Sequence, residues 1–306
     1  MIPKGLKKGD IIGVIAPSNP ITENSMPEIN NSIELLRKNG YEVKIGKYAL
    51  NNEYGYSASP QSKAKDINEM FADQKIKMLF CANGGFNSNS VFDYLDYEII
   101  KNNPKIICGF SDSTSLLNVI HEKTGLVTFH GPTLKSLTTW ETDYGFKEII
   151  KRFEKESLEL GTSDDQYVTI KDGECEGQLV GGNLNLISKM VCGKYNVNFE
   201  NKILFIEELG LESPPGMISN YLYYMKQNDV FDKIKGVWVG NYETEYKVAL
   251  EEILVQVLQN EYNKLPIIKS NNFGHTDRKT VIPIGTKARI NTTKEVKIEL
   301  LENCVE

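Results

Sequence analysis

A serine separates two apolar segments in the sequence Gly109-Phe-Ser-Asp-Ser-Thr114. Residues 106–108 predict a buried strand and residues 116–120 predict a helix, so Ser111 would lie on a sharp strand-to-helix turn. A serine held in this way is exposed, and the amide of Asp112 after it faces the place where an oxyanion would form. Ser and Asp are also good helix caps, so this segment alone fits either a nucleophile or an N-cap.

A serine nucleophile needs a base, and the chain contains three histidines. His121 lies on the helix predicted after Ser111, which indicates packing or surface exposure, and His130 ends a short strand. His275 lies in a loop beyond apolar residues 265–268, among small and polar neighbours that leave access for a substrate. His275 is therefore the best placed of the three, although a lone loop histidine is usually just solvent-exposed.

An acidic residue ends another apolar segment in the second half of the chain. Residues 203–206 predict a buried strand, and Glu207 follows it directly. A carboxylate in this place could orient an imidazole and stabilise its protonated form. Glu208 and Glu212 are nearby rivals, and most glutamates in such places cap helices or form salt bridges.

A glycine pair, Gly84 and Gly85, lies just beyond apolar residues 78–82. Glycine lets the backbone approach a tetrahedral intermediate closely, so the Gly85 amide could join that of Asp112 in an oxyanion hole. A tight turn explains the pair equally well. The spacing is not that of a GxGxxG loop or of a Walker sequence, so these motifs predict no nucleotide cofactor.

Strands and helices alternate along the first half of the chain, which predicts a mostly parallel sheet with helices on both faces. Ligands bind beyond the carboxyl ends of the strands in such sheets. Gly84, Gly85 and Ser111 all lie at such ends. The predicted strands cover residues 11–18, 41–45, 78–82 and 105–108, and the predicted helices cover residues 28–38, 60–71 and 90–100.

The pattern changes near residue 150, so we expect an α/β protein of two domains. A Rossmann-like domain with a mostly parallel sheet would cover residues 1–150, and a charged linker would cover residues 151–173. An α/β domain with a mixed sheet would cover residues 174–306. Residues 282–290 and 296–300 predict closing antiparallel strands in this second domain.

The composition is that of an ordinary globular protein. The 306 residues carry a net charge of −6, which argues against a nucleic-acid-binding face. Residues 1–10 contain no apolar signal segment, and no apolar run is long enough to cross a membrane, so we expect a cytoplasmic protein. The five cysteines form no CxxC pair, which predicts free thiols and no zinc site.

Six short segments carry a family resemblance that extends from Ile11 to about Asn291. In chain order they are Asn83-Gly-Gly-Phe-Asn-Ser-Asn-Ser90, Gly109-Phe-Ser-Asp-Ser-Thr114, Thr128-Phe-His-Gly-Pro132, Gly181-Gly-Asn-Leu184, Ile203-Leu-Phe-Ile-Glu-Glu208 and Phe273-Gly-His275. Each is weak alone, but the six in sequence are specific. Together they resemble the LD-carboxypeptidase family of serine peptidases, which also contains the microcin C immunity proteins.

The resemblance implies a Ser–His–Glu triad in the cleft between two domains, without metal or cofactor, in an enzyme that often forms homodimers. Ser111 corresponds to the nucleophile, His275 to the base and Glu207 to the orienting acid. His121 and His130 correspond to no catalytic residue. The implied activity is hydrolysis of an amide bond near the carboxyl end of a small peptide-like substrate.

Two departures from the muropeptide-cleaving members leave the substrate open. Those members usually carry Arg-Gly-Gly-Tyr-Gly where this chain has Asn83-Gly-Gly-Phe-Asn87, and they tend to have an arginine in the stretch that corresponds to residues 212–217. Residues 83–90 and 221–231 look more like the immunity-protein branch. The candidate substrates are a peptidyl- or aminoacyl-nucleotide of the microcin C kind, as in self-immunity, and an L,D-peptide from peptidoglycan, as in cell-wall recycling.

Four residues are candidates for substrate binding. Trp140 could stack on a base, and Arg278 could pair with a carboxylate or phosphate. Packing at a domain edge is the commoner explanation for a tryptophan such as Trp140, and a surface salt bridge is the commoner one for an arginine such as Arg278. Gly84 and Asn183 lie in the shared segments. A non-catalytic protein that binds a small molecule in the same cleft is the alternative to an enzyme.

Overall fold

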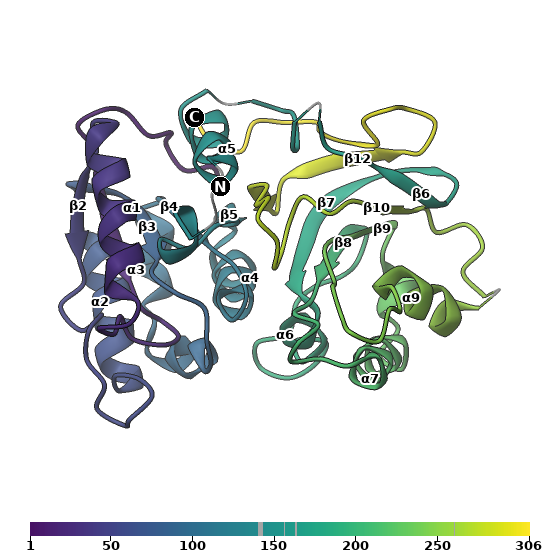
Figure 1. Ribbon diagram of the computed structural model, residues 1–306, viewed down its shortest axis with the longest axis horizontal. Helices are drawn as coiled ribbons and strands as arrows, with labels where there is room; N and C mark the ends of the chain where they lie inside the picture. Colours follow the sequence, from purple (N-terminus) through teal and green to yellow (C-terminus); the bar gives the residue numbers. More distant parts are fainter. Residues whose placement is uncertain (140–142, 156, 163, 260) are drawn as a thin grey trace.

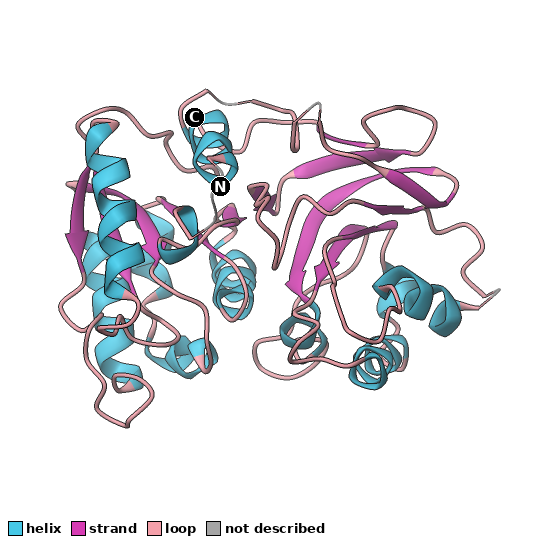
Figure 2. Ribbon diagram, viewed as in Figure 1, coloured by secondary structure: helices cyan, strands magenta, loops and turns pink. Residues whose placement is uncertain are grey.

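Two β-sheets stand side by side in the computed structural model, and helices accompany each of them (Figure 1, Figure 2). The structure describes residues 1–139, 143–155, 157–162, 164–259 and 261–306. The two ends of the chain meet beside the first sheet, where the Glu306 amide donates to the Pro3 carbonyl at 3.0 Å. Among the described residues, no helix has the length and apolar character that crossing a membrane requires.

The first sheet is mostly parallel, as the alternating pattern predicts. Its strand order is β11-β5-β4-β3-β1-β2, and of these strands β11 runs antiparallel to its neighbour. The central strands are buried apolar runs because both of their faces are covered. The bounds are β1 Ile11–Ile15, β2 Glu42–Ile45, β3 Ile76–Cys81, β4 Ile106–Gly109, β5 Thr128–His130 and β11 Ile282–Ile284.

Helices α1 and α2 follow the predicted periodicity, whereas the single helix predicted over residues 90–100 is wrong. A 3₁₀ helix over Ser88–Tyr94 and a short α-helix over Tyr97–Asn102 take its place, because the chain is extended at Leu95 and Asp96 between them. In α1 the buried side chains of Ile29, Ile33 and Leu36 recur at helical spacing. Helix α2 starts with Pro60 after Ser59, whose side chain accepts a hydrogen bond from the Ser62 amide and so caps the helix. The bounds are α1 Met26–Lys38, α2 Pro60–Ala72, η1 Ser88–Tyr94, α3 Tyr97–Asn102, α4 Ser113–Thr124, η2 Lys135–Leu137 and α5 Tyr144–Phe153.

The second sheet is mixed, also as predicted. Its order is β13-β12-β7-β8-β9-β10-β6, with β7, β8, β9 and β10 parallel to one another. The bounds of its strands are β6 Val168–Lys171, β7 Glu174–Asn183, β8 Lys202–Glu207, β9 Gly236–Val239, β10 Ile267–Lys269, β12 Lys287–Asn291 and β13 Ile298–Leu300. The helices are α6 Leu184–Ser188, α7 Pro215–Lys226, α8 Val230–Lys233 and α9 Leu250–Leu258.

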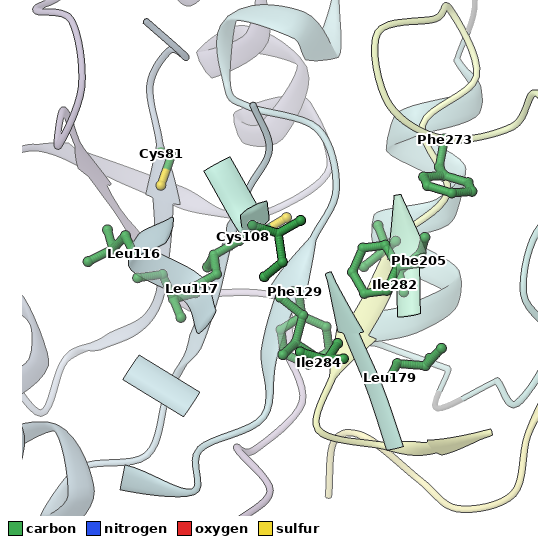
Figure 3. Packing of buried hydrophobic residues seen from close by; sticks show 14 of the residues in the cluster. Cys81, Cys108, Leu116, Leu117, Phe129, Leu179, Phe205, Phe273, Ile282 and Ile284 are labelled. Carbon is green, nitrogen blue, oxygen red and sulfur yellow. The ribbon is translucent and has the colours of Figure 1, made fainter. Parts of the chain in front are cut away.

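An apolar layer joins the two sheets. Phe129 of β5 and Ile282 of β11 lie opposite Leu179 of β7 and Phe205 of β8, and all four side chains are buried (Figure 3). Helix α4 also bridges the sheets, because Asn118 donates to the Gly181 carbonyl at 2.9 Å. The carboxyl ends of β4 and β8 therefore face a common region.

The connections between the sheets are more interleaved than the sequence suggests. Strand β6 lies within residues 151–173, the predicted linker, and forms an edge of the second sheet. Strand β11 belongs to residues 174–306 but pairs with β5 of the first sheet. The domain boundaries at residues 150 and 173 stay a prediction.

Candidate active site

Ser111 occupies the turn between β4 and α4. Its backbone has φ 59°, in the left-handed region that residues other than glycine rarely adopt. Its carbonyl accepts a hydrogen bond from the Thr114 amide at 2.9 Å, which closes the turn into the helix. This strained strand-to-helix turn projects the serine hydroxyl away from the sheet. The sequence predicts the turn, but nothing in its residue types predicts the left-handed backbone.

His275 reaches this serine from the loop that follows β10. Its Nε2 lies 3.2 Å from the Ser111 Oγ. The His275 carbonyl accepts a hydrogen bond from the Asn241 side chain at 2.8 Å, and the Phe110 ring packs against the imidazole edge with ring centroids 5.1 Å apart. Asn241 thus holds the backbone of His275 and Phe110 packs on its ring, while the residue remains partly exposed.

Glu207 completes the arrangement from the end of β8. Its fully buried side chain places Oε2 2.7 Å from His275 Nδ1 and 3.2 Å from the His275 amide nitrogen. Because a carboxylate only accepts, Nδ1 carries a proton and the Nε2 lone pair faces Ser111. The three residues that the resemblance assigns to a triad therefore form one continuous chain of contacts.

The electrostatics of this pair favour a proton on the imidazole. Burial alone would lower the pKa of His275, but the negative charge and hydrogen bond of Glu207, with the charge of Glu208, raise it above its ordinary value. Burial alone would raise the pKa of Glu207, but the His275 charge and hydrogen bonds hold it below its ordinary value. Glu207 therefore stays ionised and stabilises an imidazolium.

Gly274 precedes the histidine and lies tightly against Glu207. It has φ +94°, and a Cβ on it would lie 2.6 Å from the Cβ, Cγ and Oε2 atoms of Glu207. We expect Gly274→Ala to lower the free energy of unfolding by about 1–3 kcal/mol and kcat by about 100-fold, because it displaces the His275–Glu207 contact. Urea denaturation and steady-state kinetics measure the two effects.

Gly9 offers a matched control for this substitution. It has nearly the same φ, +93°, but no atom lies within 4 Å of its added Cβ. Gly9→Ala should cost about 1 kcal/mol of stability through backbone strain alone and leave kcat unchanged. Equal effects of the two substitutions on kcat would show that the close approach at Gly274 does not position the histidine.

The oxyanion-hole candidates lie next to Ser111. A Cβ on Gly84 would be 3.1 Å from the Ser111 Cβ, and Gly85 has φ +130°. The Asn19 side chain fixes this turn by accepting a hydrogen bond from the Phe86 amide at 3.3 Å. Within the described part of the chain, the amides of Gly85 and Asp112 have no acceptor. Their role as an oxyanion hole stays a prediction.

Two cavities meet at Ser111. The first has a volume of about 620 Å³ and is lined by Gly84, Phe110 and Lys279, among others. The second has a volume of about 480 Å³ and is lined by residues of η1 and α6. Ser111, Glu208, Leu209 and His275 line both cavities. A substrate could therefore extend to either side of the serine.

Of the four residues predicted to bind substrate, two line the cavities at Ser111. Gly84 lines the first cavity and Asn183 lines the second. Arg278 lines neither, because its Nε pairs with Asp165 Oδ1 at 2.8 Å; the salt-bridge interpretation is the one that fits its position. Trp140 lies outside the described residues.

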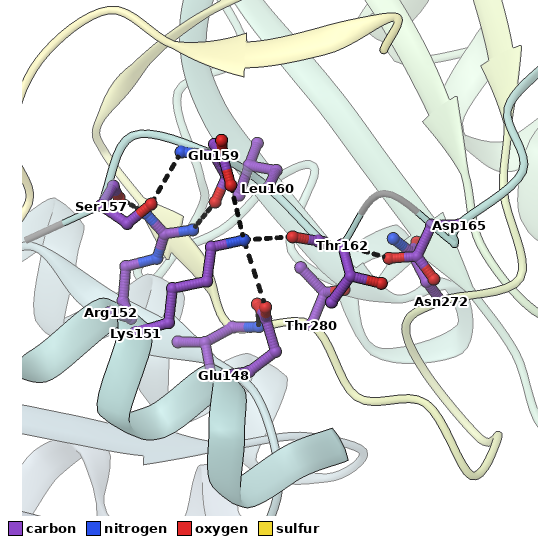
Figure 4. Close-up of polar contacts among 12 residues, drawn as sticks. Glu148, Lys151, Arg152, Ser157, Glu159, Leu160, Thr162, Asp165, Asn272 and Thr280 are labelled. Carbon is purple, nitrogen blue, oxygen red and sulfur yellow. Dashed lines mark hydrogen bonds and ion pairs between the residues drawn. The ribbon is translucent and has the colours of Figure 1, made fainter. Parts of the chain in front are cut away.

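Polar contacts join the His275 loop to helix α5, and Figure 4 shows the contacts of Lys151 and Arg152 that join α5 to the segment after it. Glu148 accepts a hydrogen bond from the Val281 amide at 3.3 Å. The Tyr144 hydroxyl lies 2.8 Å from the Thr280 hydroxyl and 2.7 Å from Asp165. Arg278 also stacks on the Tyr144 ring at 4.7 Å. These contacts fix the far end of the loop that carries the histidine.

The other two histidines take no part in this arrangement, as expected. His121 contacts the Leu126 carbonyl through Nδ1 at 2.9 Å. His130 is buried among Phe110, Phe205 and Phe273, and burial lowers its pKa to about 4, so it is neutral at pH 7. No group of His, Cys, Asp and Glu among the described residues has the arrangement of a metal site.

Two lining residues were not assigned from the sequence. Lys279 lies four residues after His275 and borders the first cavity, and burial lowers its pKa to about 8. Glu208 borders both cavities next to Glu207. The sequence signals Glu208 only as a rival to Glu207, because two adjacent glutamates at a strand end are equivalent by type.

Both halves of the chain match domains of one known protein family. Residues 12–131 match the LD-carboxypeptidase N-terminal domain, and residues 176–290 match the LD-carboxypeptidase C-terminal domain. A probable murein peptide carboxypeptidase of Bacillus subtilis is 32% identical over 97% of this chain and 93% of that protein. The microcin C7 self-immunity protein MccF of Escherichia coli is 28% identical over 94% of this chain and 92% of its own length.

Solved structures with the same fold include a MccF-like protein from Bacillus anthracis. It has a TM-score of 0.89 and 30% sequence identity, with 99% of both chains covered. MccF in complex with aspartyl sulfamoyl adenosine has a TM-score of 0.90 and 26% identity, with 100% of each chain covered. The likeness thus spans both sheets and the region between them.

Proposed function

The chain belongs to the LD-carboxypeptidase family and is a serine-type carboxypeptidase, and from this premise we propose that Ser111, His275 and Glu207 are its catalytic triad. The observation that carries the proposal is the continuous set of contacts from Ser111 Oγ through His275 to Glu207. A serine, a base and a buried orienting carboxylate in this relation can perform acyl transfer without a metal.

The proposed reaction has two steps. His275 Nε2 takes the Ser111 hydroxyl proton while Oγ attacks the carbonyl carbon, and the amides of Asp112 and Gly85 bind the oxyanion. His275 then gives this proton to the leaving nitrogen, the C–N bond breaks, and an ester forms on Ser111. Water attacks the ester with His275 as the base, which releases the acid and restores the serine.

The raised pKa of His275 predicts the acid side of the pH profile. Only the neutral imidazole can accept the serine proton, so kcat/KM should fall as the pH drops through a pKa above the ordinary value of 6.5. Steady-state kinetics between about pH 5 and 9 measure this limb. A midpoint below 6.5 would contradict the influence of Glu207 on the imidazole.

We propose an aminoacyl- or peptidyl-nucleotide as the substrate, in a self-immunity or detoxification role. MccF, which this chain resembles across its length, has been solved with aspartyl sulfamoyl adenosine. The cavities of about 620 and 480 Å³ on either side of Ser111 can take large groups on both sides of the scissile bond. An aminoacyl-nucleotide has a large leaving group, whereas the D-alanine released from an L,D-tetrapeptide would leave most of a cavity unfilled.

An L,D-peptide of peptidoglycan is the second candidate, because the Bacillus subtilis relative at 32% identity is a probable murein peptide carboxypeptidase. The purified protein should be given aspartyl sulfamoyl adenosine and, separately, a tetrapeptide ending in D-alanine, with Ser111→Ala as the control. Hydrolysis of the first compound with the higher kcat/KM supports our proposal, and a preference for the tetrapeptide contradicts it. The homodimer and the cytoplasmic location stay predictions.

A further inference from the structure

Glu208 is a buried carboxylate at the wall between the two cavities. The residue is 3% exposed. Its Oε1 accepts hydrogen bonds from the Asn183 side chain at 2.8 Å and from the Leu209 amide at 2.9 Å. Its Oε2 accepts one from the Asn185 amide at 2.8 Å. The carboxylate is thus held rigidly. Asn183, which lines the second cavity, also helps to position Glu208 through this hydrogen bond.

Glu208, unlike Glu207 beside it, forms no ion pair within the described part of the chain. Glu207 contacts His275, whereas no Lys, Arg or His among the described residues forms an ion pair with Glu208. The six residues outside the description, at positions 140–142, 156, 163 and 260, include no basic residue. Buried charges in proteins are usually paired, because leaving one uncompensated is costly.

The position of Glu208 indicates where its cation would come from. The residue lines both cavities together with Ser111 and His275, so a group bound at the serine can reach it. An ionised carboxylate offers about four acceptor sites, and the neighbouring amides use three of them. Burial and the nearby charge of Glu207 raise the pKa of Glu208. A cation bound in the cavity would lower this pKa again, because it stabilises the ionised carboxylate.

We propose that Glu208 binds the α-ammonium group of the residue whose carbonyl Ser111 attacks. This ammonium is attached to the carbon next to the scissile carbonyl, so it must lie close to the serine during the reaction. The proposal rests on the proposed role of Ser111 as the nucleophile. It implies that the site selects an acyl group with a free α-ammonium. An aminoacyl compound has this free ammonium, whereas the corresponding nitrogen of an L,D-tetrapeptide is already acylated and uncharged.

A pair of compounds that differ only in this amino group tests the proposal. Aspartyl sulfamoyl adenosine carries it, and succinyl sulfamoyl adenosine lacks it. The wild-type protein should favour the aspartyl compound in kcat/KM by about 10- to 100-fold, as expected for one charged hydrogen bond. In Glu208→Gln this ratio should fall to within about threefold of unity. General damage to the fold lowers both values and leaves their ratio unchanged.

Glu212 provides the matched control, because it is an exposed glutamate that lines the second cavity. Glu212→Gln should keep the wild-type ratio. Binding of the same two compounds to Ser111→Ala, with and without Glu208→Gln, gives the ratio of Kd values without any turnover. A wild-type ratio that persists in Glu208→Gln, or equal binding of the two compounds to Ser111→Ala, would overturn the inference. Failure of the wild type to cleave either compound, with the binding ratio intact, would instead overturn the proposed function.

Discussion

Ser111→Ala should lower kcat by about 10⁴- to 10⁶-fold, because it removes the atom that forms the covalent intermediate. The free energy of unfolding should change by less than about 1 kcal/mol, since alanine meets nearly the same strain at φ 59° as serine does. Steady-state kinetics on the compound that the wild type cleaves, together with urea denaturation, measure both quantities. The variant should still bind the substrate.

Ser113 is the control for this substitution. It lies two residues further along, is fully buried and belongs to the first turn of α4. Ser113→Ala should lower kcat by less than about tenfold. Retention of more than about 1% of wild-type kcat by Ser111→Ala would mean that another group performs the attack.

Glu207→Gln should lower kcat by about 10³- to 10⁴-fold. The amide can donate to Nδ1, which favours the tautomer with its proton on Nε2, and this tautomer cannot accept the serine proton. Loss of the negative charge also removes the main influence that raises the pKa of His275, so burial should then bring that pKa below its value in the wild type. Kinetics and NMR titration of the imidazole check the two effects.

The control here is Glu212→Gln, which removes an exposed carboxylate from the same region and should leave kcat within a few-fold of wild type. Circular dichroism should show that both variants are folded. If Glu207→Gln loses less than about tenfold in kcat, or if the pKa of His275 does not fall, the carboxylate is not the partner of the base.

The sequence predicts the fold well where one pattern persists over several elements. The alternation in the first half predicts the parallel sheet, and the apolar run before Gly109 predicts the strand that leads to Ser111. The return of β11 to the first sheet was not predicted, because residues 282–290 form one apolar-rich stretch in the sequence. Gly285, with φ +90°, divides this stretch into β11 and β12, which join different sheets. No local pattern specifies which sheet a short strand joins.

The site is harder to predict from the sequence than the fold, because its residues come from both sheets. Patterns place Ser111, Glu207 and His275 at strand ends, but the contacts among them depend on how the sheets pack. The choice between Glu207 and Glu208 depends on which one faces the histidine loop at the end of β8. Two glutamates have the same residue type, so the sequence does not distinguish them. Arg278 could be read as a substrate partner or as a salt-bridge residue, and its partner proves to be Asp165, a residue more than a hundred positions away that the sequence does not single out.

The central claim is that His275 makes Ser111 a nucleophile, and covalent labelling tests it most directly. The protein is treated with a serine-reactive phosphonate, and the modified residue is located by mass spectrometry in wild type, Ser111→Ala and His275→Ala. Our account predicts one label per chain on Ser111, no label in Ser111→Ala, and labelling slowed by about 10³-fold or more in His275→Ala. Labelling of another serine, or an unchanged rate in His275→Ala, would contradict it.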